Sequence, residues 1–175
     1  MKRNAILAAV AAILICVCLT ACAGKTSAKA GDTRFNEQSL VLNIGDKAYA
    51  LGIDAAPVLE TLGAGYEYSE AISCLYDGMD KTFIYPGVSV YTIPDGDRDL
   101  VEMYELTDGT YTVACGIRVG DTIENAEKLL GDEWFDDGYV TYAVGNDPED
   151  YSADRLQLYV TDGIIQNIYL FAPGY

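Results

Sequence analysis

The sequence contains no histidine, a single tryptophan and few bases: 11 lysine and arginine residues stand against 27 aspartate and glutamate residues. Without an imidazole, serine and cysteine lack the usual base that activates them as nucleophiles, and the commonest zinc ligand is missing. The net charge of −16 argues against nucleic-acid binding, because phosphate groups require a basic surface. No phosphate-binding or dinucleotide-binding glycine motif is present either. We therefore expect a protein that is not an enzyme, needs no metal or organic cofactor and binds no nucleic acid.

The first 21 residues have the layout of a lipoprotein signal peptide. Lys2 and Arg3 precede an uncharged apolar run over 5–19, which is too short for a membrane-spanning helix. The letters LTAC at 19–22 resemble a lipobox, the motif at which the signal is cut and the cysteine receives a lipid. We predict a signal peptide over 1–21, lipidation of Cys22 and a place on the extracytoplasmic face of the cell membrane. The alternative is an ordinary signal peptide in which Cys22 is incidental.

Residues 22–38 carry the predicted lipid and a flexible tether. They are rich in Ala, Gly, Lys, Ser and Thr and show no apolar periodicity. Removal of the signal takes away two bases and no acid, so nine bases remain against 27 acids, a net charge of −18. Such a surface favours solubility and does not attract anionic lipid headgroups. The lipid alone is therefore expected to hold the protein on the membrane.

Two cysteines, Cys74 and Cys115, remain after the signal and the lipidated residue are set aside. An exported pair can form a disulfide, and this pair is our candidate for one. Spacing alone does not show that the two sulfur atoms meet. The alternative is a pair of buried thiols that act as small hydrophobic side chains.

The folded part is predicted to repeat one order of elements, a short helix followed by antiparallel strands. Capping residues and glycine stops place helices over 54–63 and 122–131. A hairpin with a turn at Gly45 precedes the first helix. Strand-like runs and turn residues predict the remaining strands: 72–76, 82–85, 88–93, 100–106, 139–144, 155–161 and 164–171.

A shift of 68 residues superimposes the two halves of this pattern. A change to 65 in the last strand then places Tyr104 on Tyr169. The fold class expected is α+β, with two tandem units over 39–111 and 112–175, each a short helix packed on an antiparallel β-sheet. The pairs matched by the shift of 68 include Gly52 with Gly120, Asp54 with Thr122, Leu62 with Leu130, Gly63 with Gly131 and Tyr91 with Tyr159. The predicted core includes Val58, Leu59, Leu62, Val90, Ala126, Leu129, Leu130, Leu158 and Ile168.

The stretch from Val119 to Gly131, with Gly120-Asp121-Thr122 before the helix and Leu130-Gly131 at its end, resembles the opening of the β-lactamase-inhibitor-protein-like family. That family shares its unit fold with small outer-membrane assembly lipoproteins. Residues 73–81 and 90–94 are similar to lipoproteins of Gram-positive gut bacteria that have no characterised role. The resemblance covers about residues 40–175 and implies a sheet that grips a protein partner. It carries over no binding residue.

Three aspartates, Asp95, Asp97 and Asp99, alternate in one predicted turn and are the only weak candidates for metal ligands. A twelve-residue calcium loop needs a bidentate acid at its last position, and Leu106 occupies that position. Arg98 also lies among the three carboxylates. We therefore favour a polar hairpin turn and predict no metal site.

These features favour a membrane-anchored lipoprotein that acts as a non-catalytic protein-binding or scaffold module for an unknown protein or cell-wall partner. Two alternatives remain open: a lipoprotein that binds a divalent cation or small ligand through its acidic loops, and an envelope hydrolase that uses carboxylates. The chain has 14 tyrosines, which suit both cores and interfaces. Those in strands, such as Tyr91, Tyr104, Tyr159 and Tyr169, are expected mostly to pack in the core or across strands.

Overall fold

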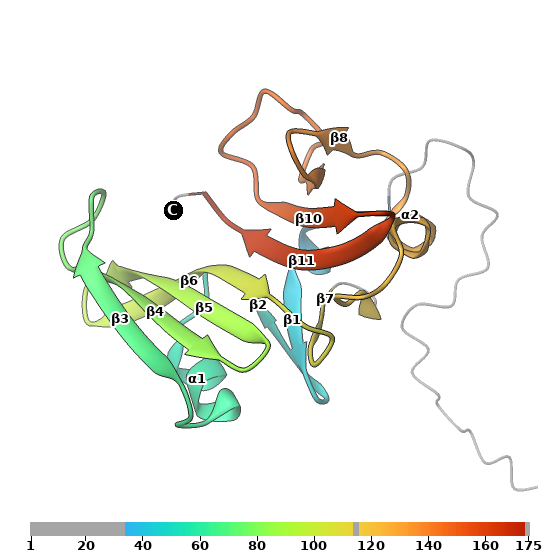
Figure 1. Ribbon diagram of the computed structural model, residues 1–175. Helices are drawn as coiled ribbons and strands as arrows, with labels where there is room; N and C mark the ends of the chain where they lie inside the picture. Colours follow the sequence, from blue (N-terminus) through green and yellow to red (C-terminus); the bar gives the residue numbers. More distant parts are fainter. Residues whose placement is uncertain (1–33, 114–115, 174–175) are drawn as a thin grey trace, which may run out of the picture.

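The computed structural model describes residues 34–113 and 116–173. The predicted signal peptide, lipidated Cys22 and most of the tether lie outside these residues, as does Cys115. Within the described part, the chain forms eleven strands, two short α-helices and one 3-10 turn (Figure 1). The helices are α1 (Ala56–Leu62) and α2 (Ile123–Leu130), and the 3-10 turn is Glu37–Ser39.

The strands form two antiparallel sheets (Figure 1). The small sheet has the order β2-β1-β7, and the large sheet has the order β3-β4-β5-β6-β11-β10-β9-β8. The strands are β1 (Val41–Ile44), β2 (Lys47–Ala50), β3 (Glu67–Ile72), β4 (Met79–Tyr85), β5 (Val88–Asp95), β6 (Arg98–Leu106), β7 (Thr112–Val113), β8 (Phe135–Asp136), β9 (Val140–Ala143), β10 (Arg155–Thr161) and β11 (Ile164–Phe171).

The predicted fold class is wrong. The protein is mostly β, and its two helices are only seven and eight residues long. The strands of the two halves do not form two separate sheets, because β6 pairs with β11 from Leu106↔Ile168 to Met103↔Phe171 and makes one continuous eight-stranded sheet. A free strand edge favours such pairing, since it satisfies backbone groups that would otherwise face solvent. The proposed boundary between residues 111 and 112 stays a prediction.

One hydrophobic core lies against the inner face of the large sheet. Alternate residues of the central strands, such as Tyr104, Leu158 and Leu170, are fully buried there, as the two-residue period of a strand requires. Val58 of α1 and Leu130 of α2 belong to the same cluster. Six residues of the predicted core are buried: Val58, Val90, Ala126, Leu130, Leu158 and Ile168. Three more are partly buried and pack against it: Leu59, Leu62 and Leu129.

Both helices lie where capping residues and glycine stops predicted them. Thr122 caps α2, and its side chain accepts a hydrogen bond from the Asn125 backbone at 3.2 Å. Asp54 precedes α1 by two positions and accepts from the Ala56 N–H at 2.9 Å. Each helix ends at a glycine with positive φ, which an L side chain rarely adopts.

The same backbone bonds recur at the two helix entries. The N–H of Gly52 donates to Val101 O, and the N–H of Gly120 donates to Ile165 O, both at 2.8 Å. The two acceptors, Val101 of β6 and Ile165 of β11, are 64 residues apart. The repeat therefore relates β6 to β11 by a shift of 64 residues and not by the predicted 65. With the corrected shift, buried Tyr104 matches buried Ile168. A slip of one residue moves a side chain to the other face of a sheet, which explains why the predicted match of Tyr104 with Tyr169 fails.

The strand predicted over 72–76 is also wrong. β3 ends at Ile72, and the chain then turns through 73–78. All six residues of β3 are exposed, so no buried face imposes a polar–apolar alternation on its sequence. The apolar letters that suggested a strand, such as Leu75, lie in the exposed turn.

Candidate functional site

The outer face of the large sheet carries a group of tyrosines. Tyr169 lies directly opposite Glu105, next to buried Leu170 and Leu106, and so points away from the core. Tyr91 reaches Glu105 on this outer face. We call the set Tyr91, Tyr139, Tyr159 and Tyr169 the tyrosine face.

Glu105 of β6 is the polar centre of this surface. Its carboxylate accepts a hydrogen bond from the Tyr91 hydroxyl at 2.8 Å and from the Asn167 amide at 3.5 Å. Burial, followed by the bond to Glu105, raises the pKa of Tyr91 to about 12. Burial and the charge of Glu105 likewise raise the pKa of Tyr169. Both hydroxyls therefore keep their protons at neutral pH and can act as donors.

Tyr139 joins the face from the connection between β8 and β9. Its ring centroid lies 5.7 Å from that of Tyr169 and 6.2 Å from that of Tyr159, both in edge-to-face geometry. Such packing holds aromatic rings in fixed positions. Tyr159 remains 47% exposed, so a large amphipathic ring is held in place at the surface and open to contact.

A second polar group borders the tyrosine face. Asp137 accepts hydrogen bonds from the Thr141 hydroxyl at 2.7 Å and from the Gln157 amide at 3.3 Å. Gln157 also lies 3.4 Å from the Thr141 hydroxyl. These bonds fix the turn that carries Tyr139, which lies two residues after Asp137.

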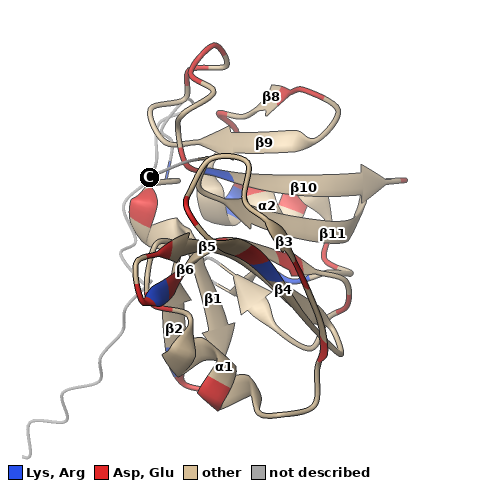
Figure 2. Cartoon of the chain, turned by 90° about the vertical axis from the view of Figure 1, so that its left-hand side faces the viewer, with Lys and Arg blue, Asp and Glu red and all other residues tan. Residues whose placement is uncertain are grey.

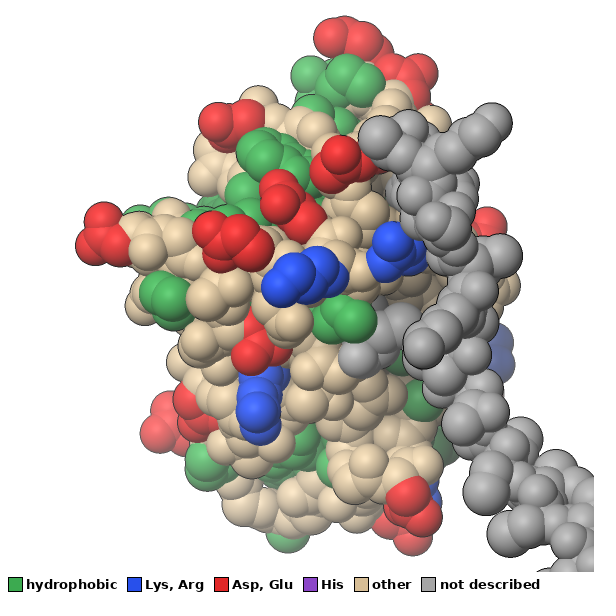
Figure 3. All heavy atoms as spheres, turned by 90° about the vertical axis from the view of Figure 1, so that its right-hand side faces the viewer, with side chains coloured by type: hydrophobic (Ala, Val, Ile, Leu, Met, Phe, Trp, Pro, Cys, Tyr) green, Lys and Arg blue, Asp and Glu red, His purple; other side chains and the backbone are tan. Residues whose placement is uncertain are grey.

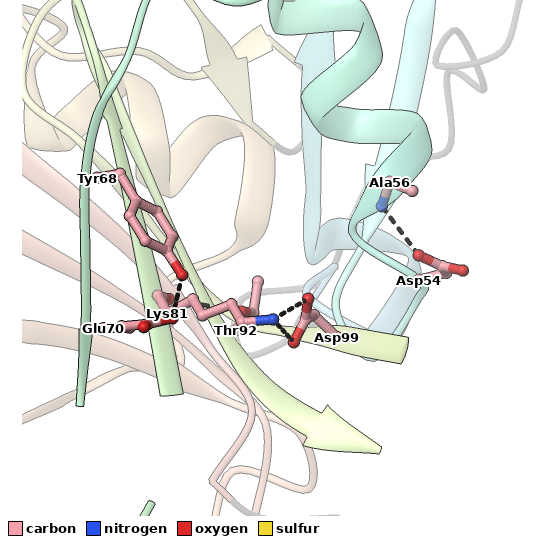
Figure 4. A network of polar contacts seen from close by, with 7 residues as sticks. All are labelled: Asp54, Ala56, Tyr68, Glu70, Lys81, Thr92 and Asp99. Atoms are coloured by element: carbon pink, nitrogen blue, oxygen red, sulfur yellow. Dashed lines mark hydrogen bonds and ion pairs between the residues drawn. The ribbon is translucent and has the colours of Figure 1, made fainter. Parts of the chain in front are cut away.

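The acidic turn between β5 and β6 does not gather its aspartates around one point. Asp95 forms an ion pair with Arg98. Asp99 forms one with Lys81 at 2.8 Å (Figure 4). Asp97 lies exposed at the tip of the turn. Among residues 34–113 and 116–173, no three His, Cys, Asp or Glu side chains are placed to hold a metal ion. Two of the three aspartates predicted as weak metal candidates, Asp95 and Asp99, therefore bind bases of the same chain.

The outer face also holds a pair of acids, Asp80 of β4 and Glu102 of β6. Burial raises the pKa of the Glu102 carboxyl, and the charge of Asp80 raises it further. The Oδ1 atom of Asp80 is buried and has no hydrogen-bond partner within the described part of the chain. Neither residue lines the hollow at 64–67 and 84–86 or the hollow at the turn between β5 and β6.

Acidic side chains are spread over the surface with few bases among them. Figure 3 shows this distribution on the side that carries α2. Only three ion pairs form between described residues, and all three use bases within the chain: Lys81 with Asp99, Arg98 with Asp95, and Arg118 with Asp121. Most acids are therefore left to interact with solvent or with a basic partner.

Cys74 lies exposed in the turn after β3 and forms no disulfide with any described residue. Its proposed bond to Cys115 stays a prediction, because Cys115 lies outside the described residues. No helix in the described ranges is long and apolar enough to cross a membrane.

No protein-family model matches the chain, and no curated protein or solved structure matches it significantly. The family resemblance expected from residues 119–131 therefore stays a prediction.

The sequence indicated two features of this site only in part. It predicted core or cross-strand packing for most strand tyrosines: Tyr104 is fully buried, and the rings of Tyr159 and Tyr169 pack against Tyr139 on the outer face. Tyr139 is the first residue of the strand predicted over 139–144, and at a strand boundary the alternation of the sequence does not show which face a side chain occupies. Its neighbour Gly138, with a φ of 100°, was the available signal for a turn that redirects the chain.

Proposed function

We propose that this protein is a membrane-anchored extracytoplasmic lipoprotein whose folded part binds a protein partner without catalysing a reaction. The tyrosine face is the observation that carries the proposal. Tyrosine suits interfaces because it buries a large area, loses little conformational entropy and offers a hydrogen bond at the ring edge. The absence of histidine from the sequence supports a binding role over an enzymatic one.

The arrangement around Glu105 gives the proposed surface its specificity. A partner that approaches Tyr159 meets rings already ordered by Tyr139 and hydroxyls already ordered by Glu105. Ordering side chains before contact lowers the entropic cost of binding. A cation-binding role has less support, since Asp95 and Asp99 are occupied by Arg98 and Lys81.

The binding role is tested by affinity capture of the full-length lipoprotein from solubilised membranes of its own cells. We expect a specific partner with the wild type, and at least about a tenfold loss with Tyr139→Ser and Tyr159→Ser together, the loss that two interface anchors produce. Tyr151→Ser is the matched control, because Tyr151 is 73% exposed and lies outside the sheet. Equal capture by all variants would contradict the proposed face.

Anchoring is tested separately at Cys22. A radioactive fatty acid should label the wild type, and Cys22→Ala should release the protein from the membrane. A Cys22→Ala protein that is processed and retained as before would contradict the lipid anchor. This result is independent of the capture experiment.

A further inference from the structure

The outermost strand of the large sheet, β3, has one unpaired edge. It pairs with β4 along its whole length, from Glu67↔Ile84 to Ile72↔Met79, without a register shift. No described strand pairs with its other side. In an antiparallel strand, alternate residues direct their N–H and C=O groups to opposite sides. The free side of β3 therefore presents a regular row of backbone donors and acceptors. Figure 2 shows β3 running beside β4.

Natural proteins usually protect such an edge with lysine, proline, a bulge or a very short strand. β3 is six residues long, regular and without lysine or proline, so among the protective devices it has only charged side chains, those of Glu67 and Glu70. Every one of its residues is exposed. The only charges along it are the carboxylates of Glu67 and Glu70.

One face of this edge alternates apolar and acidic groups. Tyr68 and Ile72 are 49% and 81% exposed and lie on the same face as Glu70, which is between them. The Tyr68 ring packs against Phe83 with centroids 5.3 Å apart, and its hydroxyl donates to Glu70. Tyr68 is thus held on the sheet while half of its surface stays open.

Glu70 is not neutralised by the strand beside it. Lys81 lies opposite Glu70 in the register, but its ammonium group bonds both oxygens of Asp99 at 2.8 and 2.9 Å (Figure 4). Neither Glu67 nor Glu70 belongs to an ion pair formed by the described residues. The edge therefore carries two uncompensated negative charges on a chain that is already strongly acidic.

We propose that the free edge of β3 binds an extended segment of a partner protein as an added strand, in which apolar and basic residues alternate. Backbone hydrogen bonds would supply affinity, and side chains beside Tyr68, Glu70 and Ile72 would supply selectivity. A lysine or arginine of the partner lies near Glu70, and its apolar neighbours cover Tyr68 and Ile72. An open hollow of about 460 Å³, lined by 64–67 and 84–86, adjoins the start of β3 and accommodates a further side chain.

Charge selects this partner over a second copy of the chain. β3 contains no base, so pairing of two β3 strands would bring Glu67 and Glu70 of both copies into one short ladder. Like charges across a strand pair are destabilising. The site lies away from the tyrosine face, so the inference stands or falls independently of the proposed function.

The test is a titration of the full-length protein in detergent with a synthetic peptide of alternating valine and lysine, as long as β3. We expect saturable binding below about 1 mM, the weak end of measured affinities. Reversing both charges, with Glu67→Lys and Glu70→Lys, should weaken binding about tenfold, because two favourable edge charges become unfavourable. The same variant should bind an alternating valine–glutamate peptide more tightly than the wild type does.

The matched control is Asp136→Lys, which reverses an exposed acid on β8 at the opposite edge of the sheet. This variant should bind the valine–lysine peptide as the wild type does. Three results would overturn the proposal: no binding up to about 1 mM, equal weakening by Asp136→Lys and the β3 reversals, or self-association of the wild type that the β3 reversals abolish. Protection of β3 amides from hydrogen exchange by the peptide distinguishes strand addition from charge attraction elsewhere.

Discussion

The two edge strands of the large sheet, β8 and β3, differ in length and in how the residues around them are bonded. At one edge β8 is only two residues long, and the chain around it is fastened to other elements. The Trp134 indole donates to Glu127 of α2 at 3.1 Å, and Asp137 ties the following turn to Thr141. At the other edge β3 is six residues long and exposed throughout.

The two edges differ in strand length and in the side-chain bonds of the residues that flank them. β8 contributes two backbone pairs, and Trp134 just before it is bonded to Glu127 of α2. β3 contributes six pairs to β4, but no helix or loop of the described residues bonds its outer side. Aromatic contacts such as Tyr68 with Phe83 hold its face and leave its edge open.

The largest difference in stability should come from removing one tyrosine ring near each edge, Tyr142 of β9 and Tyr68 of β3. Tyr142 of β9 is fully buried, and its hydroxyl donates to Gly131 O at 3.0 Å. Tyr142→Ala should lower the free energy of unfolding by about 3–5 kcal/mol, as large-to-small core changes do. Tyr68→Ala should cost less than about 1 kcal/mol, because half of that ring is exposed. Urea unfolding measures both, and equal losses would contradict the contrast.

A smaller effect is expected from the bond that closes the β8 edge. Trp134→Phe keeps a ring but removes the donor to Glu127, and should cost about 0.5–1.5 kcal/mol. Hydrogen exchange should also speed up in β8 and β9 while β3 is unchanged. Tyr68→Phe is the control, since its hydroxyl bonds Glu70 in solvent. If Trp134→Phe left exchange in β9 unaltered, the indole would have no part in closing this edge.

A substitution in the acid pair Asp80 and Glu102 should raise the free energy of unfolding instead of lowering it. The pKa of Glu102 is raised by burial and by Asp80, so the folded protein holds this proton more tightly than the unfolded chain. The stability linked to this proton is fully present below the pKa of Glu102 in the unfolded chain. It is lost as the pH rises through the pKa of Glu102 in the folded protein. At neutral pH, Glu102→Gln should therefore stabilise the protein, by less than about 1 kcal/mol because solvent screens the half-buried group.

This gain should fade as the pH falls toward about 4, where the carboxyl is protonated in both states. Melting temperatures measured across this range test it. Glu60→Gln on the exposed side of α1 is the control and should change little. A destabilising effect of Glu102→Gln at neutral pH would show that the charge is compensated.

The smallest expected effect is a change in the pKa of Tyr91, which lies on β5 between the two edges of the sheet. The pKa of Tyr91 is raised to about 12 by burial and by Glu105, so stability linked to this proton is present below the usual tyrosine pKa of about 10 and is lost as pH rises through about 12. Glu105→Gln should lower the pKa of Tyr91. Stability at neutral pH should not change through this titration, because Tyr91 is protonated there in both proteins. Ultraviolet titration, with Tyr91→Phe to assign the signal, measures it.

Local signals predicted the first hairpin and both helices, but not the fold class. The turn at Gly45 gave the first hairpin, and Gly63 and Gly131 gave the ends of both helices. These features depend on neighbouring residues, because only glycine tolerates positive φ without strain. The pairing of β6 with β11 depends on residues more than 60 positions apart, and no local pattern specifies it. That long-range pair joins the strands of the two halves into one eight-stranded sheet.

The site was harder to predict for two physical reasons. A bulge near Thr92 and another near Val160 shift the register, and each shift decides which tyrosines face outward. The exposed strand β3 has no buried side, so its sequence lacks the alternation that marks other strands. The acidic turn at Asp95–Asp99 showed its composition clearly, but only the structure showed that Arg98 and Lys81 occupy its carboxylates.

The central claim is that the tyrosine face and the long β3 edge bind protein while the short β8 edge does not. The most direct measurement places a photo-crosslinking residue in the full-length lipoprotein, one position at a time, in its own cells. Crosslinks to a protein partner are predicted from Tyr159 and Ile72 and not from Asp136 or the control Tyr151. Equal crosslinking from Asp136, or none from both Tyr159 and Ile72, would contradict the account.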